Sequence, residues 1–250
     1  MAGEPGVGPG VGPGAGPKPR LVLATHNQGK LRELRELLRG QVPGLDVDSQ
    51  VVDAGAVGGP DVAETGVTFA ENSLLKARAV AEATGLVAIA DDSGLAVDVL
   101  GGAPGIFSAR WAGRHGDDRA NLELLLAQLA DIDEMHRGAR FVCAAALAVP
   151  AVGTADGGTA AGAAVRPAAG AAAGAAGAAV EHVEMGELPG VLLREPRGSG
   201  GFGYDPILSP DGLYVSCAEL APEEKNAISH RGQAFRKLLP HIVAALEAAE

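Results

Sequence analysis

Val87-Ala88-Ile89-Ala90-Asp91-Asp92-Ser93-Gly94 is the stretch of sequence that decides the fold. Its apolar half, Val87–Ala90, is typical of a strand buried on both faces, as in sheets covered by helices. Two carboxylates follow at the expected carboxyl end of that strand, where α/β proteins bind ligands. Such oxygen ligands suit Mg²⁺, which also neutralises phosphate charge. The alternative is a solvated turn, because Asp, Ser and Gly are common turn residues and Gly94 permits a tight bend.

Apolar segments and helical patterns alternate along the rest of the chain. The sequence predicts a strand at 21–24 and a helix at 29–38, whose leucines share one face. Thr68-Phe69-Ala70-Glu71 matches a capping box and opens a helix that extends to about residue 83. This alternation predicts an α/β fold in which helices cover a sheet. The remaining expected elements are strands at 95–100, 141–149 and 183–193, and helices at 121–129 and 231–248.

Composition restricts the class of protein. Hydrophobic residues make up 47% of the 250 residues and aromatics only 3%, so we expect a core of Leu, Val, Ile and Ala. The net charge of −11 argues against a nucleic-acid surface. No apolar run is long enough to span a membrane and no secretory signal is visible, so we expect a cytoplasmic protein with a small-molecule partner. Cys143 and Cys217 lie in no motif and are expected to be buried free thiols.

Two segments have a biased composition. Residues 1–19 are rich in Gly and Pro and are expected to form a disordered tail. Residues 151–180 are dominated by Ala and Gly and are expected to form a flexible insertion between two strands. The prediction is therefore a single domain over residues 20–250 that carries this insertion.

Two further motifs contain charged groups suited to phosphate chemistry. Thr25-His26-Asn27-Gln28-Gly29-Lys30 lies between a strand and a helix, where free backbone N–H groups, the helix dipole and the Lys30 ammonium favour an anion. The alternative is a polar turn that only caps the helix. Glu64 comes shortly before the capped helix and is a candidate second metal ligand, whereas Glu71 needs no role beyond capping. Asn72 and Lys76 follow on the same helix.

The C-terminal third contains two more motifs. In Gly200-Gly201-Phe202-Gly203-Tyr204-Asp205-Pro206, glycines flank an aromatic ring that could stack on a base, although a Gly-rich hairpin would look the same. Lys225 and Ser229-His230-Arg231-Gly232 lie at the start of the last helix, where His230 could also be a simple helix cap.

Taken together, these segments resemble the inosine triphosphate pyrophosphatase family, enzymes that remove non-canonical purine nucleotides from the nucleotide pool. The resemblance covers about residues 21–150 and 181–245 and leaves out the tail and the insertion. It implies hydrolysis of ITP, dITP and XTP to the monophosphate and pyrophosphate. It also implies a mixed twisted sheet flanked by helices, two lobes around a nucleotide-binding cleft, Mg²⁺ as cofactor and a homodimer. The segments that carry it are 25–30, 64–76, 89–95 with 105–110, 201–206 and 227–232.

The resemblance also implies roles for single residues. Asp92 is the catalytic carboxylate, which activates water or holds Mg²⁺, and Glu64 is the partner metal ligand. Ser93 contacts the substrate. The triphosphate is held by Thr25, His26, Asn27, Gln28, Gly29 and Lys30, and the base and sugar are surrounded by Phe202, Gly203, Tyr204, Asp205, Lys225, His230 and Arg231.

Two alternatives remain open. A Maf-like pyrophosphatase also begins with a strand and a short polar loop, but the Phe202 and His230 segments speak against it. A nucleotide-sensing module would bind without turnover, and the intact pair Asp91 and Asp92 disfavours it.

Overall fold

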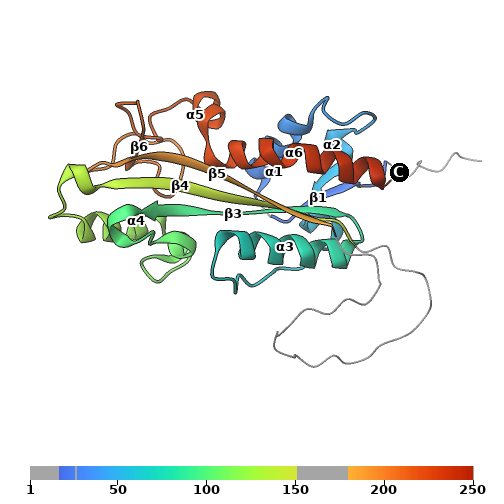
Figure 1. Cartoon of the computed structure of the whole chain (residues 1–250), viewed down its shortest axis with the longest axis horizontal. Coiled ribbons are helices and arrows are strands. Elements are labelled where there is room, and N and C mark those ends of the chain that lie inside the picture. Colours follow the sequence, from blue (N-terminus) through green and yellow to red (C-terminus); the bar gives the residue numbers. More distant parts are fainter. Residues whose placement is uncertain (1–16, 26, 151–179, 250) are drawn as a thin grey trace, which may run out of the picture.

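The computed structural model describes residues 17–25, 27–150 and 180–249. A six-stranded sheet in the order β2-β1-β3-β4-β5-β6 runs through it (Figure 1). Strand β1 is parallel to both of its neighbours, and the remaining pairings are antiparallel, so the sheet is mixed as expected. The strands are β1 Leu21–Leu23, β2 Val51–Asp53, β3 Val87–Val97, β4 Gly138–Ala148, β5 Glu181–Leu192 and β6 Leu208–Pro210.

Helices cover both faces of the sheet (Figure 1). On one face, α1 and α6 pack on odd-numbered residues of β3 such as Val87 and Ile89. On the other face, α3 packs on Ala88 and Ala90. A further apolar cluster joins α4 to the far ends of β3, β4 and β5. The helices are α1 Gln28–Leu38, α2 Val47–Gln50, α3 Phe69–Thr84, α4 Asp118–Gln128, α5 Pro222–Ile228 and α6 His230–Ala248, and short 3-10 turns are η1 Gly55–Val57, η2 Asp98–Leu100, η3 Gly105–Arg110 and η4 Glu134–His136.

The helix boundaries follow local signals. Asn27 caps α1 by accepting from the N–H groups of Gly29 and Lys30. Thr68 caps α3 by accepting from Glu71, as the capping box predicts. The Glu71 carboxylate accepts from the Val67 N–H at 2.6 Å, so it fastens the residue before the cap.

The strand prediction around the carboxylates was wrong. Residues 87–90 and 95–100 were expected to be separate strands joined by a turn, but β3 continues from Val87 to Val97 because β4 pairs with it over that length. Asp91 to Gly94 therefore lie inside a strand. Gly94 is needed for close packing rather than for a bend, since a Cβ there would lie 2.5 Å from the Gly105 carbonyl oxygen and from Ser108 Oγ.

β1 ends long before β3 does. Its last partner is Ile89, and β3 then continues beside β4 alone. Within the described part of the chain, no strand pairs with the other edge of β3 between Asp91 and Leu95. Side-chain oxygens bind two N–H groups on this edge: Asp92 Oδ1 accepts from Ser93 at 3.0 Å and Ser108 Oγ accepts from Leu95 at 2.8 Å. We call this segment, residues 91–95, the open edge.

The remaining expectations concern the biased segments, the cysteines and membrane-spanning helices. The expected tail and insertion lie outside the described residues, except for 17–19, which form no helix or strand, and Val180. The strands on either side of the insertion, β4 and β5, are antiparallel neighbours. Cys143 and Cys217 are buried and free, as expected. No helix in the described ranges is long and apolar enough to cross a membrane.

Candidate active site

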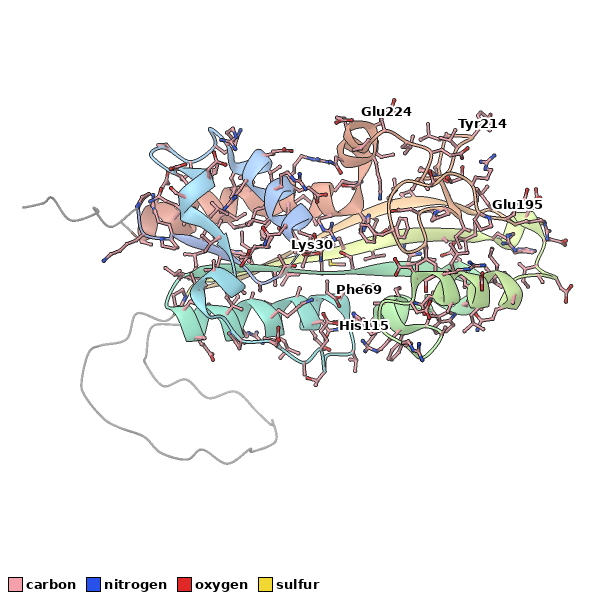
Figure 2. All side chains as sticks on the ribbon, turned by 180° about the vertical axis from the view of Figure 1, so that it is seen from behind. Lys30, Phe69, His115, Glu195, Tyr214 and Glu224 are labelled. Carbon is pink, nitrogen blue, oxygen red and sulfur yellow. The ribbon has the colours of Figure 1, made fainter. Side chains whose placement is uncertain are left out.

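The two adjacent carboxylates on β3 point to opposite faces of the sheet. Side chains alternate along a strand, so neighbouring residues cannot share a face. Asp91 meets Lys30 from α1 and Arg231 from α6, and Figure 2 labels Lys30 between α1 and the sheet. Asp92 meets Asn72 from α3. The strand thus divides the carboxylates between two separate clusters.

Asp91 anchors a buried cluster of charges. Lys30 Nζ lies 2.9 Å and Arg231 Nε 3.1 Å from Asp91 Oδ2, and the Ser93 hydroxyl donates to the same oxygen at 3.3 Å. Burial alone would raise the pKa of Asp91, but the positive charges of Lys30 and Arg231 outweigh it and hold that pKa far below the usual range. Despite burial, the Asp91 charge also raises the pKa of Arg231. Asp91 therefore stays ionised and fixes two cations, from α1 and α6, on one face of the sheet beside the open edge.

Asp92 belongs to a cluster on the α3 face. Asn72 Nδ2 donates to Asp92 Oδ2 at 3.1 Å, and Lys76 Nζ lies 3.8 Å from Asp92 Oδ1. The same ammonium lies 2.6 Å from Glu64 Oε1. Burial raises the pKa of Asp92, Lys76 lowers it, and the Glu64 charge raises it again, with a net increase. A carboxylate with a raised pKa is better able to accept a proton from water than an ordinary one.

The Glu64–Asp92 pair fits a divalent cation. Lys76 Nζ shows that a positive charge is accommodated between the two carboxylates. Mg²⁺ is commonly held by one or two carboxylates, with phosphate oxygens and water as further ligands. Within the described ranges, no group of three or more His, Cys, Asp and Glu side chains could hold a metal ion by itself. Such an ion would therefore take its remaining ligands from water or from the phosphates of a substrate.

More polar groups of the loop before α1 form hydrogen bonds within the protein than the sequence predicted. The N–H groups of Gly29 and Lys30, expected to be free, bind Asn27 Oδ1 at 2.8 and 3.3 Å. Thr25 Oγ1 accepts from the Asn27 N–H at 3.2 Å, and Gln28 Nε2 donates to Asp53 at 2.6 Å. His26 lies outside the described residues. The Lys30 ammonium, already beside Asp91, is the part of this motif that reaches the charge clusters.

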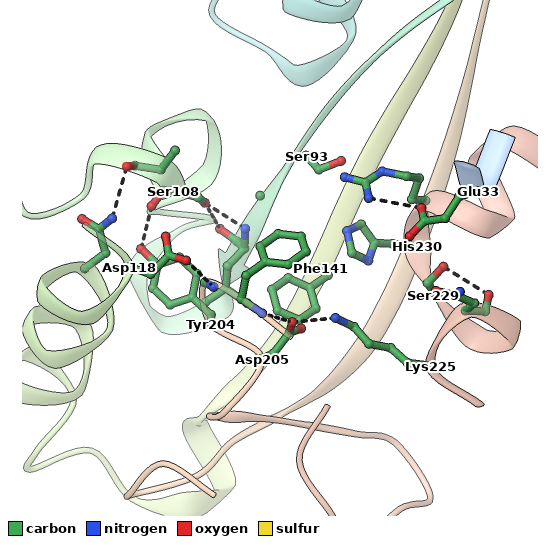
Figure 3. Close-up of a pocket in the computed structure, with 18 residues that line it drawn as sticks. Glu33, Ser93, Ser108, Asp118, Phe141, Tyr204, Asp205, Lys225, Ser229 and His230 are labelled. Carbon is green, nitrogen blue, oxygen red and sulfur yellow. Dashed lines mark hydrogen bonds and ion pairs between the residues drawn. The ribbon is translucent and has the colours of Figure 1, made fainter. Parts of the chain in front are cut away.

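A pocket next to the open edge collects most of the other predicted residues (Figure 3). Its walls come from β3, β4, the loop before β6 and the start of α6, with further residues from α1, η3, α4 and α5. Asp92, Glu64 and the described residues of the 25–30 loop do not line it, whereas Ser93 and Arg231 do and also contact Asp91. The predicted residues in its walls are Ser93, Phe202, Gly203, Tyr204, Asp205, Lys225, His230 and Arg231.

Phe202 is held at the rim of the pocket by hydrogen bonds on both sides. Its own N–H donates to Asp205 Oδ2 at 2.8 Å, and the Gly203 N–H donates to Asp118 at 2.8 Å. Lys225 Nζ lies 2.5 Å from Asp205 Oδ2 and 5.2 Å from the Phe202 ring centre. The ring remains 63% exposed, so one flat apolar face is available to a ligand.

Two of the predicted substrate contacts have structural partners. Tyr204 is buried, and its hydroxyl donates to the Ser108 carbonyl at 2.9 Å. Asp205 is likewise buried, with its carboxylate engaged by Lys225 and the Phe202 N–H. Both residues therefore shape the loop that carries Phe202.

His230 is the first residue of α6, and Ser229 is the N-cap, so His230 is not the helix cap. Its ring stacks on Phe141 with centres 5.1 Å apart, and its Nδ1 is buried without a hydrogen-bond partner among the described residues. Burial, and then the charge of Arg231, lower the pKa of His230 to about 3. The residue also lines the pocket, where a neutral imidazole can donate or accept a hydrogen bond.

Sequence reasoning overlooked the positions that connect the clusters. Asp91 was read with Asp92 as one of two possible oxygen ligands for Mg²⁺, whereas in the structure it pairs with Lys30 and Arg231. Lys76 and Asn72 were noted only as helix residues. The spacing of Asn72 and Lys76 could have revealed them, because residues four apart lie on one face of a helix. With them included, an open sheet edge bears paired carboxylates and cations beside a pocket with an exposed aromatic ring. These are features of an enzyme that acts on a nucleotide.

Comparison with known proteins also points to an enzyme that acts on nucleotides. The Ham1 family model matches residues 21–241. The dITP/XTP pyrophosphatase of Streptomyces avermitilis is 59% identical over 88% of this chain and 96% of its own. A solved HAM1 protein from Coxiella burnetii is 38% identical, with a TM-score of 0.72 over 90% of this chain and 99% of its own. A dITP/XTP pyrophosphatase from Mycobacterium abscessus is 43% identical, with a TM-score of 0.64 over 88% and 99%.

These similarities identify a hydrolase of nucleoside triphosphates. The chain belongs to the Ham1 family, whose enzymes hydrolyse non-canonical purine nucleoside triphosphates. Enzymes of this family depend on a metal ion. The α/β fold expected from the sequence is confirmed by the same solved structures.

The low pKa of His230 predicts a pH-dependent stability. Below pH about 6.5 the unfolded chain binds a proton at this residue that the folded protein does not bind. The free energy of unfolding should therefore fall as the pH decreases from about 6.5 towards 3, by about 1.4 kcal/mol per pH unit. Urea unfolding at pH 7.5 and 5.0 should show a loss about 2 kcal/mol smaller in His230→Gln than in the wild type. His136→Gln, at an exposed position, should behave as the wild type does; equal losses in all three proteins would contradict the assignment.

Proposed function

We propose that this chain hydrolyses ITP, dITP and XTP to the nucleoside monophosphate and pyrophosphate, with the triphosphate across the open edge of β3. The observation that carries the proposal is the position of Asp91. It links Lys30, on the side of the α1 loop, to Arg231 and Ser93, which line the pocket. A nucleotide with its base in that pocket therefore has its phosphates beside Lys30 and the Asp92 cluster.

The triphosphate is assigned to the segment from Thr25 to Lys30, including His26, Asn27, Gln28 and Gly29. Lys30 supports this most directly, because its ammonium lies at the open edge and has only Asp91 as an ion-pair partner in the described residues. A phosphate can share this cation with Asp91, as Arg231 already does. Thr25 Oγ1 accepts from Asn27, so its hydroxyl hydrogen is available to a phosphate oxygen.

The Asp92 carboxylate is assigned to the hydrolysis step at the α-phosphorus. Water adds to that phosphorus, the bond to the bridging oxygen breaks, and pyrophosphate leaves. Asp92 accepts the water proton or, with Glu64, holds Mg²⁺. When bound, Mg²⁺ would neutralise charge on the phosphates and the leaving pyrophosphate. Lys76 completes this assignment, because its ammonium keeps Glu64 and Asp92 together when no divalent ion is bound.

The pocket is assigned to the base and sugar. The exposed ring of Phe202 has Lys225 over one face, and its other face is suited to stacking on a purine. Ser93, Gly203, Tyr204 and Asp205 form the surrounding walls. Arg231 and neutral His230 supply hydrogen-bonding groups for an oxygen at purine C6, where adenine carries an amino group.

We also propose that residues 20–250 act as one domain in a cytoplasmic homodimer, with no nucleic-acid or membrane partner. The family resemblance supports the dimer, and the net charge of −11 speaks against a nucleic-acid partner. The tail and the insertion contain none of the proposed site residues.

Asp92→Asn should lower turnover of ITP by at least about 10²-fold, the low end for loss of a general base. The substitution keeps the shape of the side chain and the fold but removes its charge. Pyrophosphate release with Mg²⁺ present measures the effect. Asp98→Asn is a matched control, because Asp98 is exposed and pairs with Arg140 away from the site. Turnover of Asp92→Asn within a few-fold of the wild type would refute the role of Asp92.

ITP and XTP should exceed ATP and GTP in kcat/KM by at least about 10²-fold, because an unpaired buried donor facing the adenine amino group costs about 1–3 kcal/mol per contact. Guanine shares the C6 oxygen, so the pocket must also disfavour its C2 amino group. Arg231→Ala should weaken nucleotide binding and narrow the difference in kcat/KM between ITP and ATP.

Kinetics of the four substrates test both statements. Arg236→Ala is the matched control on α6, since Arg236 is exposed and donates to the Ala227 carbonyl outside the pocket. Equal kcat/KM values for ITP, ATP and GTP in the wild type would exclude selectivity for non-canonical purines. An unchanged gap in Arg231→Ala would remove Arg231 from base recognition.

A further inference from the structure

We propose that Asn72 is a positioning residue that holds the Asp92 carboxylate and the Glu64 loop in one fixed arrangement. The inference rests on the proposed function, because it assigns a catalytic purpose to the orientation of Asp92. Asn72 itself would touch neither substrate nor metal.

The hydrogen bonds of Asn72 run in two directions. Its side-chain oxygen accepts from the Gly66 N–H at 2.8 Å, and its side-chain nitrogen donates to Asp92 Oδ2 at 3.1 Å. The residue is fully buried, at 0% exposure. The Gly66 contact determines which end of the amide faces β3, since the oxygen must accept there and the nitrogen then points to Asp92.

This amide joins two segments that no strand pairing connects. Gly66 follows Glu64 by two residues, in a stretch without helix or strand. Asp92 lies on β3, and Asn72 lies on α3 between them. The packing is tight, because a Cβ at Gly66 would lie 2.7 Å from Asn72 Oδ1. Asn72 therefore sets the separation of the two carboxylates and leaves Asp92 Oδ1 facing Lys76.

Only an amide of this length supplies both contacts. A leucine would leave the Gly66 N–H and Asp92 Oδ2 without their present partners. An aspartate would still accept from Gly66, but it would place a second acceptor against Asp92. The chain also contains a matched amide, buried Asn121, which accepts from the Ala112 N–H at 2.7 Å and donates to the Ala109 carbonyl at 3.2 Å. It lies on α4 and has no carboxylate partner among the described residues.

The test is a double-substitution cycle with Asn72→Asp and Asp92→Asn in the full chain. Asn72→Asp alone should lower Tm by at least about 4 °C, since two buried acceptors then face each other. Adding Asp92→Asn reverses the pair, so that an amide at 92 donates to a carboxylate at 72, and Tm should recover. The recovery shows a direct contact, because independent sites give additive changes.

Turnover of ITP gives the second measurement. Asn72→Asp should reduce kcat by at least about 10-fold and change KM by less than about threefold, since Asn72 acts through Asp92 and not on the nucleotide. In the Asp92→Asn background the same substitution should reduce kcat no further. A merely structural role would instead lower kcat by the same factor in both backgrounds.

The outcomes separate the two proposals. Additive Tm changes, or wild-type kcat in Asn72→Asp, overturn the role of Asn72 and leave the proposed function intact. A wild type that releases no pyrophosphate from ITP overturns the proposed function itself. If Asn72→Asp does not fold alone, a folded double variant is the expected recovery and an unfolded one contradicts the inference. Asn121→Asp combined with Asp92→Asn should give additive Tm changes.

Discussion

The unequal length of β1 and β3 is the constraint on which the rest of the site depends. β1 stops pairing at Ile89, whereas β4 holds β3 straight to Val97. The strand is therefore paired along one edge and open along the other, where side chains such as Asp92 and Ser108 bind its backbone N–H groups. A ligand lying across this edge meets side chains from both faces of the sheet. One strand can thus present Asp91 and Asp92 to the same ligand although they point in opposite directions.

The carboxylates on the two faces of β3 have different roles because they have different numbers of cationic partners. Asp91 is matched by Lys30 and Arg231, so it remains ionised and fixes the two cations. Removing one partner of such a buried pair typically costs about 3–5 kcal/mol, so this cluster also holds α1 and α6 onto the sheet. Asp92 shares one cation, Lys76, with Glu64, and its pKa is raised. The first carboxylate is thus held in place, and the second is available for chemistry.

Much of the fold and part of the site could be predicted from the sequence. Leu21–Leu23, the helix from Gln28 and the capped helix after Thr68 are encoded by nearby residues, and the structure has them at the expected places. The continuous β3 could not be predicted, because polar residues at its centre look like a turn until β4 pairs with them. The short elements β2, α2, α5 and β6 were also missed, although α2 and α5 have local start signals in the Asp46 cap and in Pro222 at the first helical position.

In the candidate site, too, the motif residues could be found from the sequence but their contacts with distant residues could not. Motif residues such as His230 and Arg231 were identified because their segment resembles that of a known family. Their environment could not be read from the sequence: the neutral state of His230 follows from burial beside Arg231. The structural duties of Tyr204 and Asp205 likewise depend on partners distant in the chain, Ser108 and Lys225. Charge pairing across elements is set by the topology, which the motifs do not specify.

The most direct test of this account is a crystal structure with Mg²⁺ and an ITP analogue whose α–β bridging oxygen is replaced by a non-hydrolysable group. The account predicts that the triphosphate crosses the open edge of β3, with Lys30 within hydrogen-bond distance of a phosphate oxygen. It also predicts the α-phosphorus beside Asp92 and the base against Phe202. A nucleotide bound with its phosphates away from residues 91–95, or with its base outside the pocket, would contradict it.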